Sequence, residues 1–242
     1  MQEYLTLLSN GWLQLTLTMV ISYLLGSISF SIIITRIVNN HADIRTMGSG
    51  NAGFTNVLRS VGKGPAVFTI VFDFLKGVIS VVIGWLLFST IATIDGGAVL
   101  QSEIISYGKF IAGMCCMLGH IFPIYFGFRG GKGVVTAAAM MAVADWRIFL
   151  AVIITFGIVF LITKIISKAS ILAAIMTPVY TFCVTYFLDY LPSQSEANSH
   201  TIVYVAVATV CMALVGLTVV LKHKENIKRI LNGTEKKITS KK

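Results

Sequence analysis

Residues 201–221 read TIVYVAVATVCMALVGLTVVL and contain no charged side chain. A helix over this run is long enough to cross the hydrocarbon core of a bilayer, which takes roughly 20 mostly apolar residues. Four further runs have the same character: Trp12–Ile34, Pro65–Ile91, Ile105–Phe126 and Ile171–Leu188. The sequence therefore predicts an all-α, polytopic membrane protein.

The overall composition agrees with a membrane protein. Of the 242 residues, 56% are hydrophobic and only 12% are charged, whereas a soluble domain carries about 25% charged residues. Because one soluble core could not bury this much apolar surface, lipid must cover the excess. No long linker interrupts the pattern, so residues 1–242 are predicted to form a single integral-membrane domain.

The apolar stretch Val134–Thr163 is interrupted by Asp145-Trp146-Arg147. We interpret it as two short helices joined by a tight polar turn. The first, Val134–Ala144, would extend about 16 Å at roughly 1.5 Å per residue. If both helices cross the membrane, the chain has about seven spans. If they form a re-entrant hairpin, the other spans keep their orientation.

The basic residues predict the orientation, because Lys and Arg concentrate on the cytoplasmic side of membrane proteins. With the amino terminus outside, 16 of the 19 Lys and Arg residues fall in inner segments: Arg36, Arg45, Arg59, Lys63, Arg129, Lys132, Lys164, Lys168, Lys222, Lys224, Lys228, Arg229, Lys236, Lys237, Lys241 and Lys242. The outer segments hold acidic residues: Glu3, Asp95, Glu103, Asp145, Asp189 and Glu196. The bias predicts a cytoplasmic carboxyl terminus. Basic inner segments that face anionic lipid headgroups also account for the net charge of +9, so no nucleic-acid partner is expected.

The first inner segment whose residues are suited to binding or catalysis is GSGNAGFTNVLR, residues 48–59. Its glycines let backbone amides approach an anion closely and adopt positive φ angles. Asn51 is a suitable N-cap for a helix over Ala52–Arg59, on which Asn51, Thr55 and Arg59 would share one face. We therefore expect a phosphate site. An ordinary loop before a capped helix is the alternative.

The second inner segment is Phe128-Arg129-Gly130-Gly131-Lys132-Gly133, which leads into a helix. It combines glycines, cations and a helix start, as phosphate sites do. It lacks the spacing of a nucleotide-binding P-loop, since no Ser or Thr follows Lys132. The alternative is a tight inner turn whose charges only follow the orientation bias.

The basic tail and two intramembrane features complete the set of candidates. On a helix that continues the last span, His223 and Asn226 would share a face, although simple headgroup contact is the usual role of such a tail. Asp73 and Lys76 are ionisable residues within an apolar run, which makes them functional candidates unless they merely pair. His120 is a lone histidine near the inner end of a span, and such a histidine is more often a hydrogen-bonded structural residue than a base.

Several chemistries are not supported. The sequence contains no HExxH motif and no cluster of acidic residues suited to a metal ion, so neither a metal nor another cofactor is expected. It also lacks a Gly-x-Ser-x-Gly nucleophile elbow and the His-x4-Asp acyltransferase signature.

Five stretches together resemble one enzyme family. They are Gly26-Ser27-Ile28, residues 48–59, Asp73-Phe74-Leu75-Lys76-Gly77, GHIFPIYFGFRGGKG (119–133) and HKENIKRILNGTE (223–235). In this order they resemble the bacterial acyl-phosphate:glycerol-3-phosphate acyltransferases, the PlsY family. The family usually has alanine at the position of Phe54, proline or threonine at that of Ser29 and lysine at that of Arg129. None of these departures removes an expected phosphate ligand.

The resemblance implies seven spans in the bacterial inner (cytoplasmic) membrane and an active site that faces the cytoplasm. It implies transfer of a fatty acyl group from acyl phosphate to glycerol 3-phosphate, giving lysophosphatidic acid for phospholipid synthesis. The enzyme that forms acyl phosphate is a further candidate partner. The resemblance assigns catalytic roles to Ser49, Arg59, Lys132, His223 and Asn226. The expected substrate-binding residues are Arg45, Gly48, Gly50, Asn51, Thr55, Asn56, Gly130, Gly131, Gly133 and Ser170.

Two other classes of protein fit part of the pattern. An organophosphate transporter would also present helix starts to an anion, but transporters place their ionisable groups near the middle of the membrane. A scaffold that binds acidic lipids would leave the placement of the glycines unexplained.

Overall fold

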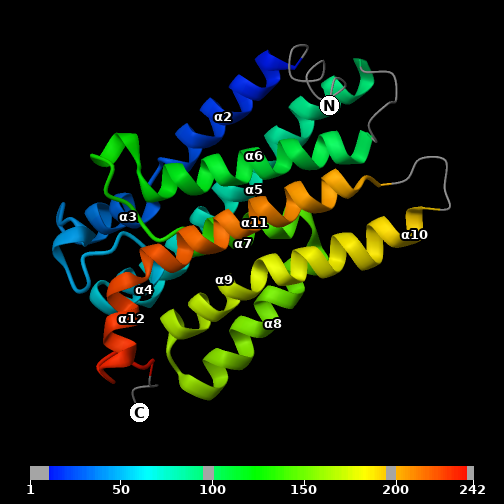
Figure 1. Cartoon of the computed structure of the whole chain (residues 1–242). Coiled ribbons are helices and arrows are strands. Elements are labelled where there is room, and N and C mark those ends of the chain that lie inside the picture. Colours follow the sequence, from blue (N-terminus) through cyan, green and yellow to red (C-terminus); the bar gives the residue numbers. More distant parts are fainter. Residues whose placement is uncertain (1–10, 95–100, 195–199, 239–242) are drawn as a thin grey trace. The chain divides into compact units, whose positions relative to one another are not determined.

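The structure is a computed structural model that describes residues 11–94, 101–194 and 200–238. Every regular element in these ranges is helical, and none of them forms a strand, as the sequence predicts. The chain divides into two compact units, Met1–Ala144 and Asp145–Lys242, which we describe separately. Figure 1 labels their helices. The orientation predictions for Glu3, Asp95, Glu196, Lys241 and Lys242 lie outside the described residues.

Unit 1 is built around four long or medium helices that pack on one another: α2, α5, α6 and α7. Shorter elements connect them. In chain order the elements are α2 (Trp12–Gly26), α3 (Phe30–Val38), η1 (Ile44–Thr46), α4 (Phe54–Ser60), α5 (Lys63–Ile94), α6 (Gln101–Ile121), η2 (Ile124–Phe126) and α7 (Val134–Ala144). The two glycine-rich segments lie between α3 and α4 and between α6 and α7.

The first predicted span, Trp12–Ile34, lies within the apolar helical segment Trp12–Val38, but it is not one continuous helix. Helix α2 ends at Gly26, and Ser29 adopts an extended conformation before α3 begins. The Ser27 hydroxyl donates to the carbonyl of Tyr23, 2.8 Å away. Such a local bond competes with helix continuation. The break turns the chain from the long helix into the first glycine-rich loop.

The helices of unit 1 approach one another through glycines. A Cβ atom at Gly26 would collide with the backbone of Cys116 on α6, and one at Gly119 would collide with the backbone of Tyr23 on α2. A Cβ atom at Gly84 on α5 would collide with the backbone of Gly108 on α6, and one at Gly108 would collide with the backbone of Gly84. Small residues at such crossings allow the close backbone contact that holds membrane helices together.

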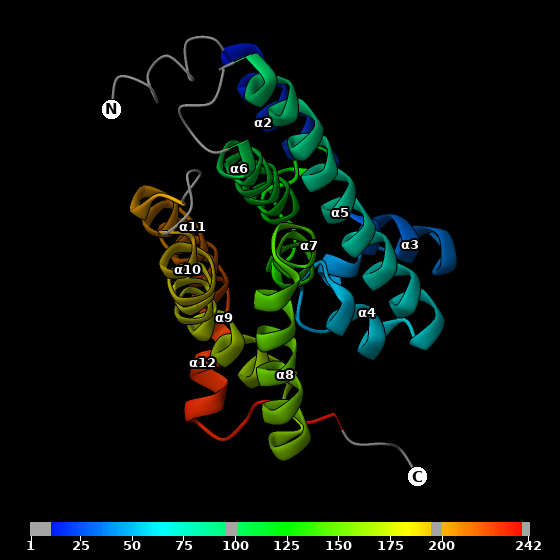
Figure 2. The same ribbon diagram turned by 90° about the vertical axis from the view of Figure 1, so that its right-hand side faces the viewer.

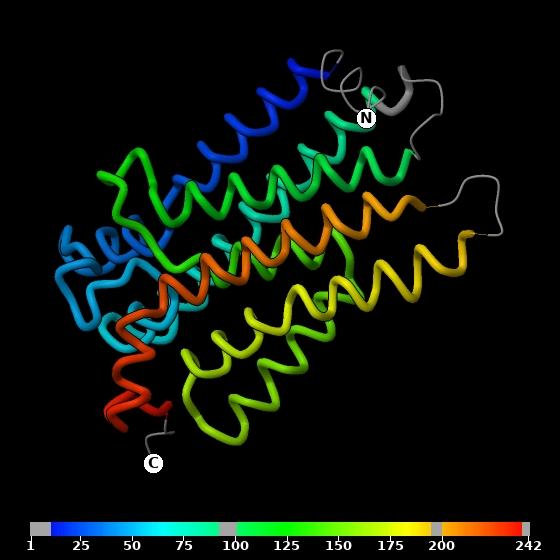
Figure 3. The backbone as a smooth tube through the Cα atoms, in the orientation of Figure 1, coloured from blue at the N-terminus to red at the C-terminus, as the bar shows by residue number. Residues whose placement is uncertain are grey.

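Unit 2 consists of α8 (Trp146–Thr163), α9 (Ile166–Cys183), the π-helical segment η3 (Val184–Tyr190), α10 (Leu191–Ser193), α11 (Ile202–Lys222) and α12 (Lys224–Leu231). Lys164 ends α8 in the left-handed conformation. The turn from α8 into α9 can be followed in Figure 3. Helices α9 and α11 lie side by side (Figures 1 and 2).

The predicted break at Asp145 is confirmed. Helix α7 ends at Ala144 and α8 begins at Trp146. Asp145 caps α8 by accepting a hydrogen bond from the amide of Arg147, 2.9 Å away. The Arg147 guanidinium also pairs with Asp145 and with Asp189 of η3, at 2.6 and 2.8 Å. A buried or lipid-facing charge is costly unless it is paired, and this arrangement satisfies it.

Among the described residues, six helical segments are long and apolar enough to cross a membrane: Trp12–Val38, Lys63–Ile91, Gln101–Phe126, Trp146–Thr163, Ile166–Ser193 and Ile202–Lys222. Helix α7 is apolar but shorter. Many large apolar side chains on these segments are exposed, for example Phe68, Leu86, Ile154 and Leu217. Surfaces of this kind are suited to lipid contact.

The glycine crossing between α2 and α6 gives a stability prediction. Gly26→Ala places a methyl group against backbone atoms of α6 that cannot move aside. We expect the substitution to lower the thermal unfolding temperature of the detergent-solubilised protein, because overpacking costs about 1–3 kcal/mol.

The matched control is Gly157→Ala on α8, where an added Cβ has no heavy atom within 4 Å. This control should leave the unfolding temperature unchanged or raise it, since alanine favours the helix. Equal effects of the two substitutions would contradict the packing role of Gly26.

Candidate active site

The first glycine-rich loop of unit 1 is anchored by Asp43, whose carboxylate caps η1. It accepts hydrogen bonds from the Arg45 amide at 2.9 Å and from the Arg45 guanidinium at 2.7 Å. Arg36 of α3 adds a weaker ion pair at 3.5 Å. The hydrogen bonds from Arg45 hold the pKa of Asp43 below its ordinary value, and the same pairing raises the pKa of Arg45. Both side chains therefore stay charged, and the pair fixes the start of the loop.

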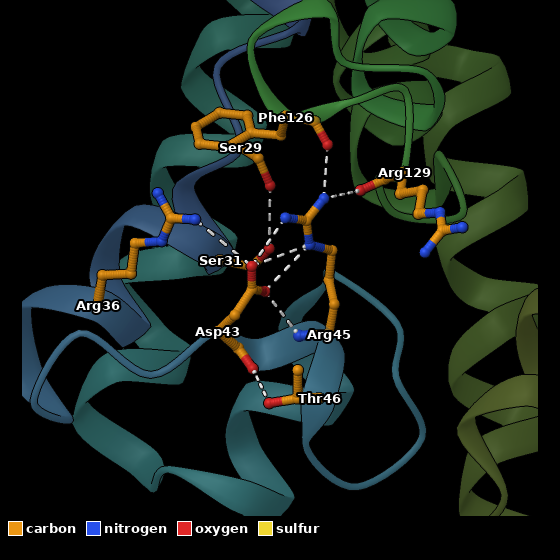
Figure 4. Close-up of polar contacts among 8 residues, drawn as sticks. All are labelled: Ser29, Ser31, Arg36, Asp43, Arg45, Thr46, Phe126 and Arg129. Atoms are coloured by element: carbon orange, nitrogen blue, oxygen red, sulfur yellow. Dashed lines mark hydrogen bonds and ion pairs between the residues drawn. The ribbon is translucent and has the colours of Figure 1, made fainter.

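Arg45 also joins the two glycine-rich loops. Its Nη1 atom donates to the carbonyl of Phe126 and, at 3.4 Å, to the carbonyl of Arg129, both in the second loop (Figure 4). The guanidinium thus bridges a carboxylate of one loop and two carbonyls of the other. Arg36 assists, with its guanidinium carbon 5.9 Å from the ring centroid of Phe126. The structure brings together two segments about 80 residues apart in sequence.

Asn56 shapes the first loop from inside. Its buried side-chain amide donates to the carbonyls of Ile44, Met47 and Asn51 at 2.9–3.1 Å. Its oxygen accepts from the amide of Ser49 at 3.0 Å. Both ends of this side chain are therefore bonded to the loop backbone. Asn56, expected to bind substrate, has the contacts of a residue that holds the loop in shape.

Helix α4 begins later than the sequence predicts. It runs from Phe54 to Ser60, and its N-cap is Gly53 with no side-chain hydrogen bond. The prediction that Asn51 caps this helix and shares a face with Thr55 and Arg59 is therefore wrong. The reason is that Asn56 captures the carbonyl of Asn51, which places that residue in the loop. Gly48 and Gly50 do adopt the expected positive φ angles, +55° and +70°.

The glycines of the second loop serve close packing. The amides of Gly130 and Gly131 donate to the carbonyls of Ile121 and His120, at 3.1 and 3.0 Å. A Cβ at Gly130 would collide with the His120 carbonyl. A Cβ at Gly131 would collide with the His120 ring and lie 2.7 Å from the carbonyl oxygen of Ala52 in the first loop. These two amides therefore bind the carbonyl end of α6.

The remaining expected residues of unit 1 lie on or beside the joined loops. Ser49 and Arg59 are exposed, and Lys132, Asn51 and Thr55 are half-buried. Gly133 is buried, with φ of +82°, at the start of α7. Among the expected catalytic residues of this region, Arg59, Lys132 and Ser49 have side chains that can bind phosphate oxygens.

In unit 2, the expected helix through His223 and Asn226 is interrupted. His223 ends α11 and precedes α12, with backbone angles outside the helical region. Its Nδ1 atom lies 2.7 Å from the carbonyl of Val219. His223 and Asn226 are both buried, with 3% and 7% of their surface exposed. They lie at and just after a bend, not on one continuous helix.

Glu235 organises the tail, although sequence reasoning gave it no role. Its carboxylate accepts hydrogen bonds from Arg229 and Asn226 and from Ser167 at the start of α9, at 2.6 to 2.7 Å. Burial disfavours the charged carboxylate, but the three donors outweigh it and hold its pKa below the ordinary value. The feature of the sequence that could have indicated this role is that Glu235 is an acidic residue just after a basic helical segment. Ser170, one turn after Ser167, donates to the Ile166 carbonyl at 3.0 Å.

These features define a polytopic α-helical membrane protein whose interhelical segments carry cations suited to phosphorylated molecules. A family model described as glycerol-3-phosphate acyltransferase matches residues 16–233. A relative from Shewanella loihica is 37% identical over 94% of this chain and 95% of its own length. Another, from Halalkalibacterium halodurans, is 36% identical over 96% of this chain and 97% of its own length. Both are named glycerol-3-phosphate acyltransferase.

The chain belongs to this family of glycerol-3-phosphate acyltransferases, integral membrane enzymes of phospholipid synthesis. A solved structure of PlsY (YgiH), an integral membrane glycerol 3-phosphate acyltransferase in its glycerol 3-phosphate form, has a TM-score of 0.71 and 29% identity. The comparison covers 93% of this chain and 96% of the PlsY chain. The lysophosphatidic acid form of PlsY gives a TM-score of 0.69 with 28% identity. The family resemblance seen in the sequence is confirmed.

The Glu235 contacts predict a stability effect within unit 2. Glu235→Ala leaves Ser167, Asn226 and Arg229 without their shared acceptor, and losing such buried partners costs about 1–3 kcal/mol. We expect a lower thermal unfolding temperature and faster proteolysis of residues 232–238.

Glu225→Ala is the matched control, since Glu225 is a mostly exposed glutamate of the same segment that pairs with Lys228 at 3.5 Å. Exposed pairs of this kind contribute little to stability. If Glu235→Ala were as stable as Glu225→Ala, the structural role of Glu235 would be excluded.

Proposed function

We propose that this chain transfers a fatty acyl group from acyl phosphate to glycerol 3-phosphate, giving lysophosphatidic acid and inorganic phosphate. Family membership and the likeness to PlsY, with its glycerol 3-phosphate and lysophosphatidic acid forms, support the acceptor and the product. The structural observation that carries the proposal is the junction of two glycine-rich basic loops by Arg45. Two phosphorylated substrates explain why one small protein has two such loops.

Acyl phosphate suits an enzyme without a protein nucleophile. It is a mixed anhydride, so its phosphate is already a good leaving group. The glycerol 3-phosphate hydroxyl attacks the acyl carbon, the bond from that carbon to the phosphate oxygen breaks, and the hydroxyl proton passes to a base or to the departing phosphate. Orientation of the two reactants then supplies much of the rate. No covalent acyl-enzyme is needed.

The cationic side chains have the matching role. In this mechanism Arg59 and Lys132 bind phosphate oxygens and stabilise the negative charge that develops during transfer. The Ser49 hydroxyl donates a hydrogen bond to the same phosphate oxygens. The other substrate-binding residues proposed in unit 1 are Arg45, Gly48, Gly50, Asn51, Thr55, Asn56, Gly130, Gly131 and Gly133. Arg45 and Asn56 also hold the loops in shape.

His223 and Asn226 have hydrogen-bonding polarity suited to the attacking hydroxyl. A carbonyl only accepts, so the contact with Val219 places the proton of a neutral His223 ring on Nδ1 and makes Nε2 an acceptor. Glu235 only accepts, so Asn226 donates to it through Nδ2 and its Oδ1 is the acceptor end. We propose that these two acceptors orient the hydroxyl of glycerol 3-phosphate, with Ser170 as a further substrate-binding residue.

For the membrane topology we propose seven passes in one domain of the bacterial inner membrane, with the amino terminus outside and the active site facing the cytoplasm. The six long apolar segments and the short helix α7 support this count. If α7 and α8 instead form a re-entrant hairpin, the number of passes stays odd. An odd number fits the basic carboxyl-terminal tail on the inner side.

The decisive test incubates the purified protein with glycerol 3-phosphate and acyl phosphate, with acyl-CoA and acyl-carrier protein as alternative donors. We expect lysophosphatidic acid from acyl phosphate alone. Arg59→Ala and Lys132→Ala should each lower kcat/KM about 10²–10³-fold in folded protein, as loss of a charge-stabilising donor does.

Lys228→Ala, which removes an exposed basic residue of α12, is the control and should keep full activity. Full activity of either Arg59→Ala or Lys132→Ala would refute the phosphate-binding role. Phosphate-ester uptake into proteoliposomes without lipid formation would favour a transporter instead.

His223 is tested by its pH–rate profile. If Nε2 takes the hydroxyl proton, His223→Ala should lose about 10²–10⁴-fold in rate and also lose the acidic limb of the profile. The measurement is kcat/KM for glycerol 3-phosphate from about pH 5 to pH 9. A variant that keeps the acidic limb would show that a phosphate oxygen takes the proton and that His223 only orients the substrate.

A further inference from the structure

Lys76 of α5 is buried within unit 1 and makes four polar contacts. Only 3% of its surface is exposed, and the same is true of the side chain of Asp73, one turn earlier. The ammonium nitrogen lies 2.8 Å from the Asp73 carboxylate. It lies 3.0 and 2.7 Å from the carbonyls of Gly26 and Ile28, and 3.1 Å from Nδ1 of His120. Asp73 and Lys76 do pair, which was the alternative to a functional role in the sequence analysis, but this pair accounts for only one of the contacts.

Two of the contacts lie at the break between α2 and α3. A helix that ends leaves its last carbonyls without amide partners, and such groups are costly inside a membrane protein. Lys76 provides a charged donor to Gly26 and Ile28, the residues that flank Ser27. The lysine therefore stabilises the break that directs the chain from α2 toward the first glycine-rich loop.

The fourth contact reaches the second loop through His120. An ammonium group has only hydrogens to offer, so Nδ1 of His120 accepts and the ring proton lies on Nε2. The same ring packs against Gly131, where any side chain would collide with it. The carbonyl of His120 accepts from the amide of Gly131, 3.0 Å away. The orientation of this ring is thus coupled to the position of the loop that carries Lys132.

We propose that Lys76, held by Asp73, is a positioning residue that sets the place of the second glycine-rich loop through the His120 ring. Its role for catalysis rests on the proposed function of that loop. The role differs from simple neutralisation of Asp73, because it depends on contacts with the α2–α3 break and with His120. A variant that removes both charges separates the two roles.

The test uses the double variant Asp73→Asn/Lys76→Met, which leaves no unpaired charge in the interior. If Lys76 positions the loop, this variant remains defective, with kcat/KM about 10–100-fold below the native enzyme, as small displacements of catalytic groups cause. If the lysine only neutralises Asp73, kcat/KM stays at the native value.

A readout independent of the reaction follows the loop itself. Arg129 is exposed, and trypsin cleavage after it reports how freely the loop moves. We expect the double variant to be cleaved there at least severalfold faster, relative to cleavage after Lys236 or Lys237 in unit 2 of the same molecule. Native cleavage and native kcat/KM together overturn the proposal. Faster cleavage in a protein that uses no acyl phosphate donor refutes the proposed function and leaves the positioning role intact.

Two single variants guard against a folding defect. His120→Asn keeps an acceptor near the position of Nδ1 but removes the ring beside Gly131, so it should also speed cleavage after Arg129 and lower kcat/KM. Ser80→Ala is the matched control: it removes a buried hydroxyl of α5 that bonds the Lys76 carbonyl, one turn away. Ser80→Ala should leave both readouts unchanged. Equal effects of Ser80→Ala and His120→Asn would show general destabilisation and exclude the positioning role.

Discussion

The bridge made by Arg45 is the contact on which the arrangement of unit 1 depends. One guanidinium binds the carboxylate of Asp43 and two carbonyls of the second loop, so it joins both glycine-rich loops at one point. A lysine would not reproduce this geometry, because only the planar guanidinium donates in several fixed directions. In the proposed function, Arg59 on α4 and Lys132 in the second loop belong to the region that this bridge holds together.

The glycines of unit 1 allow close packing both in the second loop and between helices. In the second loop, Gly130 and Gly131 donate their amides to the end of α6 and lie against His120. In the helices, Gly26 and Gly119 allow α2 and α6 to touch through their backbones. In membrane proteins, helices associate largely through van der Waals packing, and small residues allow their backbones to come close enough for it.

In unit 2, the hydrogen-bonding groups of His223 and Asn226 are oriented by neighbouring residues of the same unit. The Val219 carbonyl sets the tautomer of a neutral His223 ring, and Glu235 sets the orientation of the Asn226 amide. Glu235 can do this because Ser167 and Arg229 keep it charged and in place. Supporting residues of this kind give a site its polarity before any substrate arrives.

The sequence alone determined the helical membrane class, the break at Asp145 and the family, because hydropathy, helical spacing and ordered motifs are local properties. Only the tertiary structure decided that α2 ends at Gly26, that His223 interrupts its helix, that α4 starts after Asn51 and that Glu235 gathers the tail. Each of these depends on hydrogen bonds that form or compete once the chain is packed. The bond from Lys76 to Gly26 spans 50 positions. No periodicity in a sequence records which distant carbonyl a buried lysine will bind.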